Sequence, residues 1–265
     1  MITDLTYENL EAALSVQPAD WGDIRPHLEF YIEKEYCHCL TLSHKNRVVG
    51  IGAVIYHADT AWFAHIVVHE DFRKRGFGST ITTSLINIAK SNGYNNLFLD
   101  ATEYGYPVYK KLRFKQTGSY THLKLPEANK IIIDDSNIST ASSKEFFALI
   151  EMDMKVSGEN RIKFISPFLK DAKVYKLQNE ILGAYIPSLG DGYIMATETN
   201  AGLTLLEYRA QEQQSAVIPS ENKDAIALLI ELGFVISKES RRMTIAEDDQ
   251  WQPKWIFNRI SGQVG

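Results

Sequence analysis

The sequence predicts a mixed α/β fold divided into two domains. Apolar segments of strand length alternate with segments in which apolar residues recur at helical spacing, which is typical of α/β proteins. The chain has 265 residues, longer than the usual single domain of roughly 100–200 residues. A weak internal repeat also supports two domains, because residues 109–114 align with residues 229–234, 120 positions later.

In the first half we expect helices at 7–16 and 24–32, followed by strands at 37–42, 48–55 and 61–68. The polar turn at 57–60 predicts an antiparallel connection between the last two strands. Phe77, Ile81, Leu85 and Ile88 then lie on one face of a helix that we expect to end near Gly93. A buried strand at 97–99, a short helix at 106–111 and one or two strands within 114–125 complete this half.

The polar stretch at residues 126–130 contains a proline and predicts a domain boundary. We therefore expect domains at 1–126 and 127–265. In the second domain, helices are expected at 144–154, 203–208 and 222–232, and strands at 173–177, 181–186, 193–197, 216–218 and 242–245.

The composition excludes several classes of partner. Lys and Arg number 28 against 33 Asp and Glu, a net charge of −5, so no general attraction to nucleic acid or anionic membranes is expected. No apolar run approaches the ~18–20 residues that span a bilayer, and the first residues lack the basic and apolar pattern of a signal peptide. Two cysteines, Cys37 and Cys39, indicate reduced thiols in a cytoplasmic protein. These features make no prediction of the oligomeric state.

A basic, glycine-containing loop between a strand and a helix carries the predicted chemistry. The buried run of Ile66, Val67 and Val68 leads into it. The loop and the start of the helix then read Arg73, Lys74, Arg75, Gly76, Phe77, Gly78 and Ser79. Backbone N–H groups at a helix N-terminus bind phosphate, and glycines let the backbone approach the anion closely. The spacing fits neither the dinucleotide-binding nor the P-loop pattern.

This loop resembles the acyl-coenzyme A loop of the GNAT acetyltransferases, in which Arg73-x-x-Gly76-x-Gly78 follows a strand. Tyr109-x-x-Leu112-x-Phe114 resembles the family's Y-x-x-L-G-F ending, with Arg113 in place of the usual glycine. The run from Leu99 to Thr102 and Gly105 resembles one bacterial subgroup, in which a second, degenerate GNAT-like domain follows. The terminal Asn258-Arg259-Ile260-Ser261-Gly262 and the upstream Arg241-Arg242-Met243 match that subgroup.

The resemblance implies acetyl-CoA as co-substrate. Backbone groups of residues 66–68 would pair with its pantetheine arm, and residues 73–79 would hold its pyrophosphate. Thr102 stands where the family often has an asparagine near that arm. Tyr109 occupies the position of the tyrosine that protonates the leaving thiolate.

The general base is not evident from the sequence. Alternation along the strand puts Trp62 and Ala64 on the face of Ile66 and Val68, and puts His65 and His69 on the other face. Those two histidines would lie about 13 Å apart along a strand, so no metal site is expected. Glu103, at the end of the next strand, is the candidate base, and Glu29 and Glu33 are candidates for holding a cationic substrate.

We therefore expect an N-acetyltransferase that moves an acetyl group directly to an amine of a small molecule or protein. The alternative is a non-catalytic acyl-CoA-binding or regulatory module whose loop persists without a competent base. The second domain has Leu229 in place of the tyrosine and Glu198 before its helix. It is expected to lack a coenzyme A site and to serve a structural or substrate-shaping role.

Overall fold

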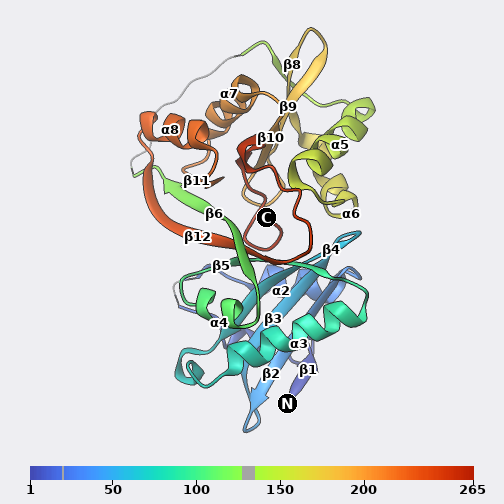
Figure 1. Ribbon diagram of the computed structural model, residues 1–265, viewed down its shortest axis with the longest axis vertical. Coiled ribbons are helices and arrows are strands. Elements are labelled where there is room, and N and C mark those ends of the chain that lie inside the picture. The colour runs from blue at the N-terminus through green and yellow to red at the C-terminus, as the bar shows by residue number, and fades with distance from the viewer. Residues whose placement is uncertain (20, 127–134) are drawn as a thin grey trace. The chain divides into compact units, whose positions relative to one another are not determined.

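The computed structural model describes residues 1–19, 21–126 and 135–265 (Figure 1). The chain forms two compact units. Unit 1 comprises Met1–Lys115, Met243–Glu247 and Gly262–Val264, and unit 2 comprises Gln116–Arg242, Asp248–Ser261 and Gly265. The first division along the chain therefore falls between Lys115 and Gln116. Most of the stretch at 126–130, where a boundary was expected, lies outside the described residues.

Strands and helices alternate through unit 1. Its elements are β1 (Ile2–Asp4), α1 (Leu10–Leu14), α2 (Arg25–Glu33), β2 (Cys37–His44), β3 (Arg47–Tyr56), β4 (Thr60–Val68), α3 (Phe77–Ser91), β5 (Asn96–Ala101) and α4 (Tyr106–Lys111).

The sheet of unit 1 has the order β1-β2-β3-β4-β5, antiparallel except for the parallel pair of β4 and β5. The long helix α3 crosses one face of it, and α2 lies on the other (Figure 1). Ile81 and Leu85 of α3 are fully buried, as the helical spacing predicts. A Cβ at Gly52 of β3 would lie 2.5 Å from a methyl group of Ile81, so glycine there lets the helix pack closely.

Unit 2 repeats this alternation of strands and helices. It contains β6 (Lys115–Lys124, from its second residue), β7 (Ile138–Thr140), α5 (Phe146–Ser157), α6 (Ile162–Ile165), β8 (Lys173–Leu177), β9 (Glu180–Ile186), β10 (Tyr193–Ala196), α7 (Thr199–Ala210), β11 (Ser215–Pro219), α8 (Lys223–Glu231), most of β12 (Val235–Ile245) and β13 (Ile256–Asn258).

One sheet of unit 2 has the order β13-β10-β9-β8-β7, and β6 lies between β12 and β11 in a second group of strands. Leu205 and Leu206 of α7 and Leu229 of α8 form the centre of its core. None of the helices that the structure describes has the length and apolar character to span a bilayer.

In two places the chain passes from one unit to the other within a strand, so that part of the strand belongs to a different unit from the helix before it. β6 comes directly after α4 of unit 1, yet from Gln116 onward it belongs to unit 2 and pairs with β11. β12 comes after α8 of unit 2, yet its end from Met243 belongs to unit 1, where the Thr244 hydroxyl donates to the Leu97 carbonyl at 2.9 Å. We call this arrangement the strand exchange.

Candidate functional site

The loop between β4 and α3 is held in place by its own polar contacts. Arg73 donates from Nε to the carbonyl of Val68 at 3.1 Å, which ties the loop to the end of β4. The guanidinium of Arg75 lies over the ring of Phe72, 5.2 Å from its centroid. Arg73, Lys74 and Arg75 are all exposed, so their charges face solvent at the start of α3.

The start of α3 suits a phosphate. Gly76 is the N-cap, with φ +84°, a conformation that glycine adopts without strain, and no side chain caps the helix. A Cβ at Gly76 would meet no heavy atom within 4 Å, and one at Gly78 would meet only a Val68 methyl at 3.9 Å. Packing therefore leaves open space beside the first N–H groups of the helix, which have no intrahelical acceptor. The pyrophosphate of coenzyme A fits this combination of dipole, N–H groups and positive charge.

The edge of β4 that leads to this loop is open toward β5. Pairing between the two strands runs from Thr60 and Asn96 to Phe63 and Leu99. Beyond that point β4 continues to Val68 without a β5 partner among the described residues. Backbone groups of residues 66–68 on this edge are placed to pair with an extended amide chain, as an added strand would.

A β-bulge in β4 makes the expected alternation wrong. Val67 and Ala64 pair with Ile51 and Ala53, so His65 and Ile66 together face the single residue Gly52. His65 takes φ +44°, and from there the side chains change face. Ile66 and Val68 pack with Phe63 against the α3 side, whereas the expectation had grouped them with Trp62 and Ala64.

Tyr109 lies buried in α4. Its ring packs against Phe114, with centroids 6.0 Å apart, and a Cβ at Gly105 would lie 3.3 Å from its hydroxyl. Burial, with a smaller contribution from Asp100, raises the pKa of Tyr109 above its usual value, so it keeps its proton at neutral pH. The hydroxyl has no hydrogen-bond partner among the residues described.

Thr102 and Glu103 follow the end of β5. The Thr102 hydroxyl accepts from the Gly105 N–H at 3.3 Å, which starts the turn into α4 and so helps to place Tyr109. Glu103 is exposed. The structure thus brings Thr102 and Tyr109 to one turn at the end of β5.

Glu29 and Glu33 of α2 have partners within unit 1. Glu29 lies 3.9 Å from the guanidinium of Arg25, and Glu33 accepts from the Tyr7 hydroxyl at 3.0 Å. The opposite face of α2 carries Tyr31 toward the sheet.

Tyr31 belongs to an aromatic cluster that sequence reasoning missed. Its hydroxyl lies 2.7 Å from Nδ1 of His65, and the rings of His27 and Trp21 lie 4.8 and 6.0 Å from the His65 ring. Burial, together with His27, lowers the pKa of His65 to about 3, so its imidazole is neutral at pH 7. Regular alternation correctly predicted that His65 and Ile66 point to opposite faces of the strand. It did not predict the contacts of His65 with Tyr31, His27 and Trp21, because these depend on the bulge.

In the described residues of unit 2, the connection between β10 and α7 is much shorter than the loop between β4 and α3. Only Thr197 and Glu198 separate β10 from α7, whereas residues 69–76 separate β4 from α3. Glu198 is the N-cap of α7, and a Cβ at Gly202 would lie 2.1 Å from the ring of Phe257. That glycine serves packing within the core rather than the approach of a ligand.

In unit 1, a helix start suited to phosphate, an open strand edge and a buried tyrosine occur on one mixed α/β sheet. Residues 6–114 match the model of the Acetyltransferase (GNAT) family. This part of the chain is therefore similar to the GNAT acetyltransferases.

Solved structures share the fold over the whole chain. A putative acetyltransferase from Pyrococcus horikoshii is 19% identical with a TM-score of 0.83, covering 100% of this chain and 95% of its own. A tandem GNAT protein from the clavulanic acid biosynthesis pathway is 14% identical with a TM-score of 0.60, covering 94% and 99%. These similarities confirm the predicted class, a mixed α/β fold of tandem GNAT-like domains. No curated protein sequence matches the chain.

Proposed function

We propose that this protein is an acetyl-CoA-dependent N-acetyltransferase that transfers the acetyl group directly to an amine of a small molecule or protein. The observation that carries the proposal is the start of α3, where open space, backbone N–H groups and three exposed cationic side chains meet the open edge of β4. The family match of residues 6–114 supports the same chemistry.

Acetyl-CoA supplies the activated acetyl thioester. The backbone of residues 73–79 holds the pyrophosphate, with the side chains of Arg73, Lys74 and Arg75 adding charge. Residues 66–68 orient the pantetheine arm through backbone hydrogen bonds, and Thr102 lies at the neighbouring strand end. The Arg73–Val68 bond keeps the loop and the strand edge in fixed register.

Tyr109 is the proposed proton donor to the departing sulfur. Its raised pKa keeps the hydroxyl protonated at neutral pH, and its unpaired hydroxyl can donate to a sulfur anion. The acceptor amine must lose a proton. For a lysine-like amine at pH 7 this costs about 4.6 kcal/mol. We assign that proton to Glu103, and we assign recognition of a cationic acceptor to Glu29 and Glu33.

The test is to mix the protein and acetyl-CoA with a panel of amines and to follow thiol release. Tyr109→Phe should lower kcat by roughly 10²–10⁴ with little change in the KM for acetyl-CoA. Tyr104→Phe is the matched control, because Tyr104 is 92% exposed and should be dispensable. Wild-type turnover by Tyr109→Phe would contradict the assigned role.

The non-catalytic acyl-CoA-binding module remains the second candidate. It is favoured by the lowered pKa of His65, because a buried imidazole in β4 with so low a pKa is a weak base. Coenzyme A binding without thiol release from any amine would support it. We also propose a cytoplasmic location, where Cys37 and Cys39 would stay free thiols.

A further inference from the structure

Unit 2 contains a cavity of about 300 Å³ on the face of the β6, β11 and β12 strands that is turned away from the core. Leu123 and Ala216 point from these strands into the core. Their neighbours His122 and Val217 therefore point to the other face, where the cavity lies.

The described residues that line this cavity are strongly cationic. Lys124, Lys238, Arg209 and Arg259 contribute positive charge, and Asp191 contributes the one carboxylate among them. The whole chain carries a net charge of −5, so this concentration is local. Like charges that line a concave surface focus their field and raise the local concentration of an ion of opposite sign.

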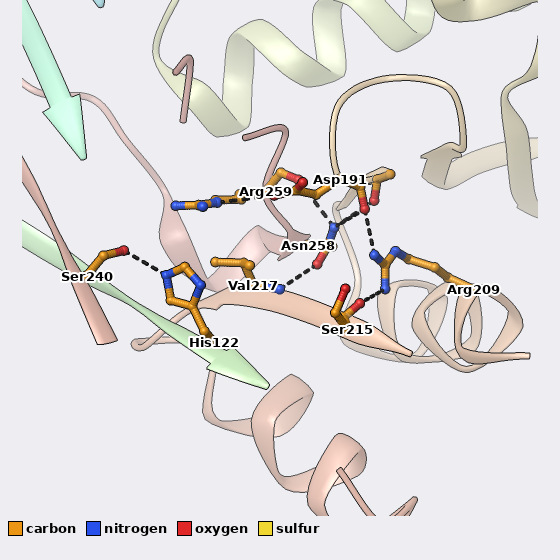
Figure 2. Close-up of polar contacts among 9 residues, drawn as sticks. His122, Asp191, Arg209, Ser215, Val217, Ser240, Asn258 and Arg259 are labelled. Atoms are coloured by element: carbon orange, nitrogen blue, oxygen red, sulfur yellow. Dashed lines mark hydrogen bonds and ion pairs between the residues drawn. The ribbon is translucent and has the colours of Figure 1, made fainter. Parts of the chain in front are cut away.

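The two arginines are buried and fixed. Arg209 is 3% exposed and donates to the backbone carbonyls of Ser215 at 2.7 Å and Asp191 at 2.6 Å. Arg259 is 7% exposed; its guanidinium lies over the Tyr120 ring, and its Nε lies 3.6 Å from the Asp191 carboxylate. Figure 2 shows the two guanidinium groups on either side of Asn258, with His122 below them on β6.

The charge of Arg209 is incompletely compensated. Its partners are carbonyl dipoles, and no carboxylate lies within 4 Å of its guanidinium in the part of the chain that the structure describes. Its Nε is also buried without a hydrogen-bond partner among those residues. Burial lowers the pKa of this guanidinium. A buried cation is costly unless an anion accompanies it, so an anion in the cavity would stabilise the pair.

We propose that this cavity in unit 2 binds a phosphate dianion, either inorganic phosphate or the phosphate group of a small monoester. Four cationic side chains and one carboxylate give the cavity an excess of positive charge. A phosphate dianion balances this excess better than a ligand with one carboxylate group would. Arginine forks and lysines are the usual ligands of phosphate oxygens. A cavity of this volume also has room for a small organic group attached to the phosphate. The site is separate from the proposed acetyl transfer and does not depend on it.

The experiment is titration calorimetry with inorganic phosphate at constant ionic strength, using the Gly76→Asp full-length chain so that the α3 loop does not contribute. In this background, Lys124→Gln with Lys238→Gln should weaken the phosphate Kd at least tenfold. Both lysines are exposed, so the fold should tolerate the change. The matched control is Lys163→Gln with Lys223→Gln, which removes the same charge from exposed positions of unit 2 outside the cavity.

An absence of binding at millimolar phosphate, or equal weakening in the two double variants, would overturn the proposal. Glycerol phosphate, titrated in parallel, distinguishes the sources: tighter binding than phosphate identifies a monoester ligand, and equal binding identifies the free ion. Neither result depends on coenzyme A binding, so failure here is distinct from failure of the proposed function.

Discussion

His65 occupies a costly position for an ionisable residue. Its backbone is in the left-handed region at the β4 bulge, and its ring lies under His27 and beside the Tyr31 hydroxyl. Burial lowers its pKa to about 3 from 6.5, so the folded state excludes a proton that the unfolded chain binds.

The stability of unit 1 should therefore fall on acidification. The contribution of neutral His65 is complete above pH 6.5, the unfolded pKa, and is lost as the pH falls from 6.5 toward 3. Between pH 7 and 5 this loss amounts to about 2 kcal/mol. Urea unfolding at both pH values measures it. His65→Gln should show a smaller pH dependence than the wild type, and an identical dependence would show that His65 does not carry the effect.

A substitution at Gly76 tests whether the loop between β4 and α3 binds the pyrophosphate of coenzyme A. Gly76→Asp places a carboxylate about 5 Å from the bound pyrophosphate, which costs about 3 kcal/mol at an effective dielectric of 20 and weakens coenzyme A binding roughly a hundredfold. Gly93→Asp is the control, because Gly93 also has a positive φ, +90°, and open space around its Cβ position, at the other end of α3. Calorimetry should show normal affinity in this control. Equal losses in both variants would point to backbone strain instead.

At the scale of elements, periodicity was sufficient to locate the long helices and central strands. Of the four residues expected to face the core from α3, Ile81 and Leu85 are fully buried, and Phe77 and Ile88 are half-buried. The helix expected at 106–111 and the strand at 173–177 match α4 and β8. Long amphipathic segments carry a repeated signal, which is why they could be predicted.

Short edge strands and irregular backbone could not be predicted. β1, β7 and β13 have three residues each, too few for an alternation to be recognised, and tertiary pairing decides their conformation. The β4 bulge inserts one residue opposite Gly52 and reverses the faces of the strand beyond it. The glycine-containing loop and the start of α3 could be located from the sequence, whereas the partners of His65 depended on this bulge.

A buried ion pair joins α5 to the turn that follows it. The Asp153 carboxylate accepts from Arg161 at 2.5 Å, and both side chains are 2% exposed. Asp153→Asn removes the carboxylate that is hydrogen-bonded to the buried guanidinium of Arg161, so unit 2 should lose about 3–5 kcal/mol of unfolding free energy. Denaturant titration measures this loss.

The exposed pair of Glu11 and Arg25 provides the comparison, since these side chains are 78% and 39% exposed. Glu11→Ala should leave the unfolding midpoint near that of the wild type, because solvent screens such pairs. An equally small effect of Asp153→Asn would show that the buried pair is compensated by other groups.

At the scale of the whole molecule, the two units repeat one fold, but among the described residues only unit 1 has a basic, glycine-containing loop between a strand and a helix. We expect calorimetry on the full chain to give one coenzyme A per polypeptide. The reason is that α7 follows β10 after Thr197 and Glu198 alone, and the Glu198 carboxylate stands beside the helix end that would hold a pyrophosphate.

The variant Gly76→Asp provides the control for this stoichiometry, since it should weaken binding at the single site roughly a hundredfold. Two sites of comparable affinity, with one surviving in Gly76→Asp, would contradict the prediction. The repeat itself was visible in the sequence, because residues 109–114 align with residues 229–234. The strand exchange was not, since no local pattern specifies which unit a strand joins.

The strand exchange also constrains how the protein is made. Unit 1 incorporates Met243–Glu247 and Gly262–Val264, so β5, which pairs with β4 on one side, acquires β12 on the other side only after a ribosome has passed the helices of unit 2. At about 5–20 residues per second, the nascent N-terminal half waits several seconds with that sheet edge uncovered. Domains commonly fold in order as they emerge, but here unit 1 is finished by segments that follow the helices of unit 2 in the chain. Completion of unit 1 thus reports that translation has passed residue 264.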